Sequence, residues 1–146
     1  MTRNIQHQIE IDAPPATVWE QLADTAAYGD WNPFVRRLSG ELSAGASLTV
    51  ELAPAGSRAM RFKPTVLAAE AGRELRWLGH FLVPGLLDGE HSFRLEELPG
   101  GRTRLIQAER FRGLLVRPAG ATLEKTRLGF EQMNRALKLR AEAAAA

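Results

Sequence analysis

A few polar side chains stand where the surrounding pattern expects apolar ones, and they are the residues that could do chemistry. Each shares one face of a predicted strand with apolar neighbours: His7, His91, Gln107 and Glu109. A polar group buried in this way is costly unless protein, water or a ligand bonds to it. These side chains are therefore candidates for recognising the polar group of a bound molecule.

His91 and Glu109 lie on predicted strands that should pair as a hairpin through the turn at Pro99-Gly100-Gly101, roughly opposite each other. A histidine beside a carboxylate can act as a general acid/base pair, which would deprotonate an acidic C–H or protonate a developing enolate. The structural alternative is a satisfied core pair that maintains strand register. The interpretation we favour lies between these two: the pair hydrogen-bonds the polar end of a bound ligand.

Several other chemistries have no support in the sequence. Cysteine is absent, which excludes disulfides, thiolate catalysis and cysteine-based zinc sites. The three histidines lack the close spacing of metal ligands, so we expect no metal site. No Gly-x-Ser-x-Gly elbow and no Gly-rich phosphate loop occurs, so we assign no catalytic nucleophile and expect no cofactor.

Strands and one long helix must position these side chains. Residues 5–11 alternate with the period of a half-buried strand, and two short helices follow it before Pro33. From Phe34 onward, alternating segments separated by turn signals predict further antiparallel strands, about seven in all. The last segment, about Ala121 to Ala143, is predicted to be a helix, with an apolar stripe made of Leu123, Phe130, Met133 and Leu137.

This order predicts an α+β fold in which a curved sheet packs on one terminal helix. Such a sheet touches a helix along only one stripe, so the rest of its concave face is either plugged or encloses a cavity. Large side chains at inward positions are the expected walls, although such residues also build ordinary cores. The predicted ligand-binding set is His7, Phe62, Trp77, His91, Phe93, Gln107, Glu109, Phe130 and Met133.

Two apolar segments, residues 81–87 and 113–118, interrupt the strand pattern. Loops are usually polar and solvated, so these require a reason. A pocket rim, a membrane-touching tip, a dimer contact or plain packing over the helix end would each supply one.

Length and composition limit the number of domains and the kinds of partner that we expect. The 146 residues suit one domain, 1–146, with one sizeable core. Nineteen Lys and Arg against seventeen Asp and Glu are scattered along the chain, so we expect no nucleic-acid partner. No apolar run approaches the length of a membrane span, and the start lacks a secretion signal, so a cytoplasmic location is the default expectation. A homodimer is compatible with the apolar loops but not required by them.

Short sequence pieces, in order along nearly the whole chain, carry a resemblance to a known family. They are Ile9-Glu10-Ile11-Asp12-Ala13-Pro14 with Val18-Trp19, Tyr28, Trp31-Asn32-Pro33-Phe34, Leu75-Arg76-Trp77, His91-Ser92-Phe93, Glu109-Arg110-Phe111-Arg112-Gly113, and Gly129-Phe130-Glu131 with Met133-Asn134 and Leu137-Lys138. The chain resembles the START-like SRPBCC superfamily, in particular its polyketide cyclase/dehydrase-like members. The resemblance implies a helix-grip fold: a seven-stranded antiparallel sheet curled around the C-terminal helix, with two small helices at its base.

Three hypotheses of function remain open, because fold does not determine function. The first is binding of a hydrophobic or amphipathic small molecule between sheet and helix. The second is polyketide cyclase, aromatase or dehydratase chemistry in the same pocket, and the third is a protein-interaction module like the co-chaperone members of the superfamily. A cavity of ~300 Å³ or more beside residues 81–87 would favour binding or catalysis, and a filled interior would favour the interaction module.

Overall fold

The computed structural model describes all residues, 1–146, as strands and helices joined by short turns. In chain order the elements are β1 (Thr2–Ile11), α1 (Pro15–Ala23), the 3-10 turn η1 (Thr25–Ala27), α2 (Tyr28–Trp31), β2 (Val35–Ser39), β3 (Thr49–Leu52), β4 (Met60–Phe62), β5 (Thr65–Glu70), β6 (Glu74–Phe81), β7 (Leu87–Leu98), β8 (Arg102–Arg112) and α3 (Gly120–Ala145). The two short helices after the first strand and the long terminal helix are confirmed.

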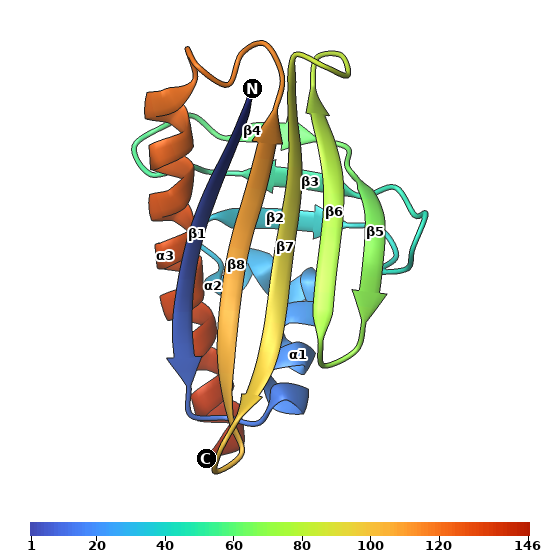
Figure 1. The fold of residues 1–146 in the computed structure, drawn as a ribbon. Helices are drawn as coiled ribbons and strands as arrows, with labels where there is room; N and C mark the ends of the chain where they lie inside the picture. Colours follow the sequence, from blue (N-terminus) through green and yellow to red (C-terminus); the bar gives the residue numbers. More distant parts are fainter.

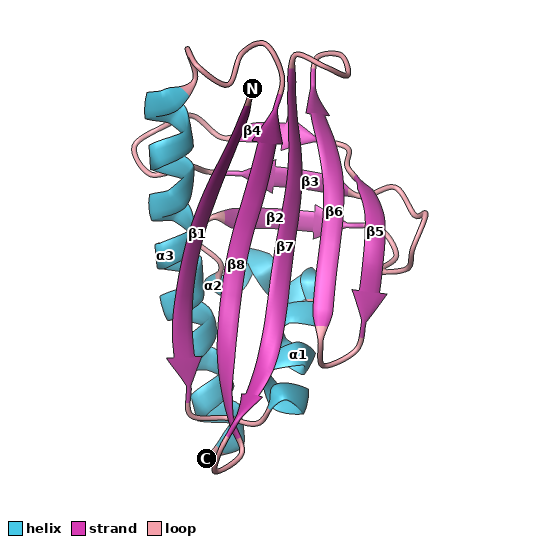
Figure 2. Cartoon of the chain, viewed as in Figure 1, coloured by secondary structure: helices cyan, strands magenta, loops and turns pink.

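The strands form two antiparallel sheets in two layers. Five long strands, in the order β1-β8-β7-β6-β5, make the front layer of Figure 1, and the small sheet β2-β3-β4 crosses behind them. The helices all lie on the same side as the small sheet, with α3 running beside β1 along one edge (Figure 2). The interior is thus the space between the concave face of the large sheet and a second layer made of α3, the small sheet and α1.

The prediction of seven strands in one sheet is wrong: there are eight, divided five and three. Pro64 lies between the short strand β4 and the next strand, β5. Proline lacks the N–H that a ladder needs and has a fixed φ, so pairing stops there. Backbone bonds from Val66 N to Ala46 O (2.8 Å) and from Leu48 N to Pro64 O (2.9 Å) still join the two sheets at this corner.

The register of the long strands sets up rows of inward side chains. His91 on β7 pairs with Glu109 on β8 and with Trp77 on β6, which confirms that His91 and Glu109 lie opposite each other. Two residues further along, the row contains Gly79 beside Gly89, neither of which has a side chain. On β6 and β7 the concave face therefore loses its bulky side chains within one step along the strands, while Phe111 of β8, the partner of Gly89, continues the row.

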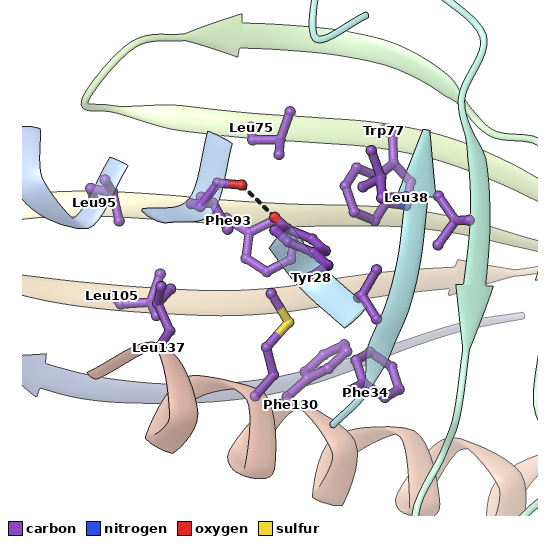
Figure 3. Close-up of a cluster of buried hydrophobic side chains, with 14 of the residues drawn as sticks. Tyr28, Phe34, Leu38, Leu75, Trp77, Phe93, Leu95, Leu105, Phe130 and Leu137 are labelled. Atoms are coloured by element: carbon purple, nitrogen blue, oxygen red, sulfur yellow. Dashed lines mark hydrogen bonds between the residues drawn. The ribbon is translucent and has the colours of Figure 1, made fainter. Parts of the chain in front are cut away.

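The end of the interior away from the start of α3 is packed solid. Tyr28, Phe34, Phe93, Phe130 and Leu137 are all fully buried there, and Figure 3 shows them between the sheet and α3. The Phe34 and Phe130 rings meet edge to face at 5.6 Å. The Phe34 ring also lies directly on Gly129 of α3, where a Cβ would overlap it.

This close approach predicts the effect of one methyl group. Gly129→Ala should destabilise the fold by about 1–3 kcal/mol, because overpacking a filled core outweighs the gain in helix propensity from alanine. Gly29→Ala is the matched control, since its Cβ would meet only Arg36 O at 3.6 Å, an ordinary contact. Urea unfolding of both variants measures the difference, and equal stability of the two would refute the packing argument.

Candidate functional site

A cavity of about 420 Å³ lies at the end of the interior where α3 begins. Its walls come from three places: Leu52, Met60 and Phe62 of the small sheet, Thr122 and Leu123 in the first turns of α3, and the inward row of the large sheet. Most of the lining is apolar. The volume exceeds the ~300 Å³ that distinguishes a ligand pocket from a filled core.

Two neighbouring strands of the large sheet carry glycines at the cavity floor, where the adjacent row carries bulky side chains. Gly79 and Gly89 lie next to each other on β6 and β7 and both line the cavity. A Cβ on Gly89 would overlap the Glu109 carboxyl, so this glycine also makes the place in which that carboxyl lies. Glycine inside a strand commonly marks such a close approach.

Both apolar segments contribute to the mouth. Phe81 and Leu87 flank the β6–β7 turn, and Leu115 and Pro118 come from the connection between β8 and α3; all four line the cavity. A backbone bond from Leu115 N to Leu86 O (2.9 Å) holds the two segments together. They form a rim, as one of the sequence interpretations proposed.

An aspartate braces the turn at this mouth. Asp88 accepts hydrogen bonds from Gly85 N (3.1 Å) and pairs with His80 Nδ1 (2.7 Å). The bond to His80, and to a smaller extent that from Gly85, holds the pKa of Asp88 below its usual value. The tip of the β6–β7 hairpin is thereby tied to a residue that lines the cavity, since His80 is also in the lining.

His91 is the polar group at the centre of the floor, and it is almost fully buried, 1 % exposed. The rings of Trp77, Phe93 and Phe130 surround it at centroid distances of 4.9, 4.8 and 4.9 Å. Its Nε2 bonds to Gln107 Oε1 at 2.9 Å. Its Nδ1 lies 3.4 Å from Glu109 Oε1 but has no hydrogen-bond partner in the protein.

The bond to Gln107 is the first link in a buried chain of side chains. Gln107 Nε2 donates to Asn134 Oδ1 (2.8 Å). Asn134 Nδ2 in turn reaches His7 Nδ1 (2.9 Å) and the His7 carbonyl (3.2 Å). Gln107 and Asn134 are both fully buried, so the chain connects the cavity floor through β8 and α3 to β1.

The predicted ligand-binding residues divide into two groups. The structure brings Phe62, Trp77, His91 and Glu109 to the cavity. The others lie away from its lining: Phe93, Phe130 and Met133 are buried in the packed half, Gln107 lies behind His91, and His7 is half-buried at the far end of the amide chain. Spacing along a strand showed which face a residue takes, but not how far along that face the packing ends.

Three residues that matter here were missed. Asn134 lies on the apolar stripe of α3, four positions after Phe130 and three before Leu137, and a polar residue on such a stripe is a usable signal. Gly79 and Gly89 carried the other signal, as glycines inside strands. In neither case does the sequence show what the residue faces.

Burial lowers the pKa of His7, and the nearby Arg135 and Arg127 lower it further, against an opposing effect of Glu131. Protonation of Nδ1 would also remove the acceptor for Asn134 Nδ2. Both effects favour the neutral ring.

No group of three or more His, Cys, Asp or Glu side chains is placed to hold a metal ion. None of the helices combines the length and the apolar character needed to cross a bilayer.

A curved antiparallel sheet closed against a long C-terminal helix, over a mostly apolar cavity, defines the START-like class of helix-grip proteins. The chain belongs to the family described as polyketide cyclase / dehydrase and lipid transport, which matches residues 2–142. The resemblance seen in the sequence is thereby confirmed. No match to the sequence was found among curated proteins.

Solved structures share the fold over the whole chain. The Zhui aromatase/cyclase from a Streptomyces species has a TM-score of 0.81 at 17% identity, with 100% of this chain and 97% of that one covered. A START superfamily protein from Mycobacterium smegmatis has a TM-score of 0.75 at 18% identity, covering 97% and 98%. A norcoclaurine synthase point mutant from Thalictrum has 0.72 at 12% identity, covering 100% and 98%. At these identities the likeness shows a common fold only.

The lowered pKa of His7 predicts how stability depends on pH. The unfolded chain takes up the His7 proton near the ordinary pKa of 6.5, and the folded chain only at lower pH, so stability falls as pH drops below that value. His7→Gln removes this titration. Urea unfolding between about pH 7.5 and about pH 5 should show a larger loss for the wild type than for the variant. Parallel losses would contradict this assignment.

Proposed function

We propose that the protein binds a hydrophobic or amphipathic small molecule, lipid- or polyketide-like, in the cavity between the sheet and α3. The observation that carries this proposal is the cavity of about 420 Å³, apolar in its walls, with His91 and Glu109 in its floor. Small-molecule sites have this composition: apolar surfaces with a few polar groups that orient the ligand.

The unpartnered nitrogen of His91 gives further support. A buried polar atom without a partner costs about 1–3 kcal/mol, and a ligand group that bonds to it recovers part of that cost. Nδ1 of His91 is such an atom, and His91 lines the cavity. The family description names both lipid transport and polyketide chemistry, each of which requires uptake of an apolar molecule.

A second candidate function is polyketide cyclase or dehydratase chemistry, and a specific observation favours it. His91 Nδ1 and Glu109 Oε1 are 3.4 Å apart at the cavity floor, the arrangement of an acid/base pair. In this role the pair would remove a proton from a C–H next to a carbonyl and return one to the leaving hydroxyl. The interaction-module hypothesis has no comparable support, because it needs no cavity.

Filling the cavity should abolish binding without unfolding the chain. Gly79→Leu places a side chain on the bare floor, where a Cβ meets only Pro64 Cβ at 3.7 Å. The matched control is Ala108→Leu, on the opposite face of the same sheet beside Ser92. With 2-methoxynaphthalene as an apolar fluorescent probe, wild type and control should bind and Gly79→Leu should lose at least about tenfold in affinity. Equal binding by all three proteins would place the probe outside the cavity and refute the proposal.

Substitutions of His91 and Glu109 distinguish a ligand-binding protein from an enzyme. For a binder, His91→Ala and Glu109→Gln should leave the fold intact by circular dichroism and weaken the affinity for a hydroxyl-bearing ligand such as 2-naphthol. If either variant instead keeps full affinity for a polyketide substrate that the wild type converts, and loses only its turnover, then the enzyme is the correct assignment.

A further inference from the structure

The two ring nitrogens of His91 face different surroundings, and the buried amide chain determines which of them carries a proton. Nε2 meets Gln107 Oε1, whereas Nδ1 lies beside Glu109 with no bond. A neutral imidazole has one N–H and one lone pair, so the assignment decides whether Nδ1 is a donor or an acceptor towards a ligand group that reaches it.

The assignment of the ring hydrogen starts from an atom whose role is certain, the backbone carbonyl oxygen of His7. The backbone carbonyl of His7 can only accept, so the Asn134 atom 3.2 Å from it must be the amide nitrogen. Asn134 Oδ1 then points at Gln107 and accepts from its Nε2 at 2.8 Å. Gln107 Oε1 is left facing His91, and since this oxygen also only accepts, His91 Nε2 must hold the hydrogen.

Turning the ring over would place a carbon atom opposite Gln107 Oε1 and lose the bond to Nε2. Trp77, Phe93 and Phe130 pack against it from three sides at 4.8–4.9 Å between centroids. The neutral ring therefore presents a lone pair 3.4 Å from a Glu109 carboxyl oxygen.

We propose that Gln107 and Asn134 are positioning residues that hold His91 in its Nε2–H tautomer, and that the pocket thereby selects apolar ligands whose polar end is a hydrogen-bond donor. A ligand hydroxyl or N–H placed at Nδ1 donates a hydrogen bond to it and so satisfies a buried acceptor that has no partner in the protein. A free carboxylate would meet a lone pair and a second carboxyl group, and burying like charges together is strongly unfavourable. This inference rests on the proposed function.

The first test reads the tautomer directly. Two-bond ¹H–¹⁵N correlation spectra of histidine-labelled protein distinguish a protonated from an unprotonated ring nitrogen. Wild-type His91 should show a protonated Nε2 and a bare Nδ1, and Asn134→Leu should shift the ring to a mixture of tautomers. A neutral wild-type ring protonated on Nδ1 would overturn the proposal.

Two variants separate positioning from loss of stability. Asn134→Asp keeps an oxygen for Gln107 Nε2, so it should retain the wild-type tautomer of His91 although it removes the bond to the His7 carbonyl. Thr103→Val, which removes a different buried bond, that to Ala13 O (2.7 Å), should leave the His91 spectrum unchanged. A tautomer shift in Thr103→Val as large as in Asn134→Leu would mean that the amides have no specific role.

The second test uses three matched probes: 2-naphthol, which has a donor, 2-methoxynaphthalene, which has none, and 2-naphthoate, which is an anion. The wild type should bind 2-naphthol about tenfold more tightly than the other two, and Asn134→Leu should lose most of that preference. If all three bind equally, or naphthoate binds best, this inference fails and the proposed function stands. If none binds, the proposed function fails and with it the ligand preference, while the tautomer assignment is judged by the spectra alone.

Discussion

The hydrogen-bonded amides of Gln107 and Asn134 lie at the boundary between the packed and the hollow half of the molecule. Both side chains are fully buried, and between them they bond to His91, to the His7 ring and to the His7 backbone. Buried amides must be satisfied, so this chain restricts how β1, β8 and α3 can lie relative to each other. The His91 ring at the cavity floor is positioned in the same way, because it is the last member of this series of hydrogen-bonded side chains.

The concave face of the large sheet is covered by packed side chains on one side of this boundary and borders the cavity on the other. Towards the C-terminal end of α3, aromatic rings fill the concave face, and Phe34 approaches α3 so closely that only Gly129 fits there. Towards the start of α3, Gly79 and Gly89 carry no side chains and leave room for the cavity and for the Glu109 carboxyl, and two apolar segments form a rim around the opening. The packed core and the cavity thus occupy different rows of one continuous sheet.

Much of this arrangement follows from the sequence, and the part that does not has physical causes. Alternation and turn signals predict the long strands, the hairpin that pairs His91 with Glu109, and the terminal helix. The strand count failed because the strands β4 and β5, with Pro64 between them, belong to two different sheets. The depth of the pocket could not be predicted, because Phe93 and Phe130 face inward like Trp77 and differ only in what the second layer places over them.

The central claim is that the interior is hollow and takes a donor-bearing apolar molecule at His91. A crystal structure of the protein with 2-naphthol tests it most directly. The account predicts the naphthalene rings inside the cavity and the hydroxyl oxygen within about 3 Å of His91 Nδ1. A probe bound on the outer surface, or bound inside with its hydroxyl at the mouth and away from His91, would contradict it.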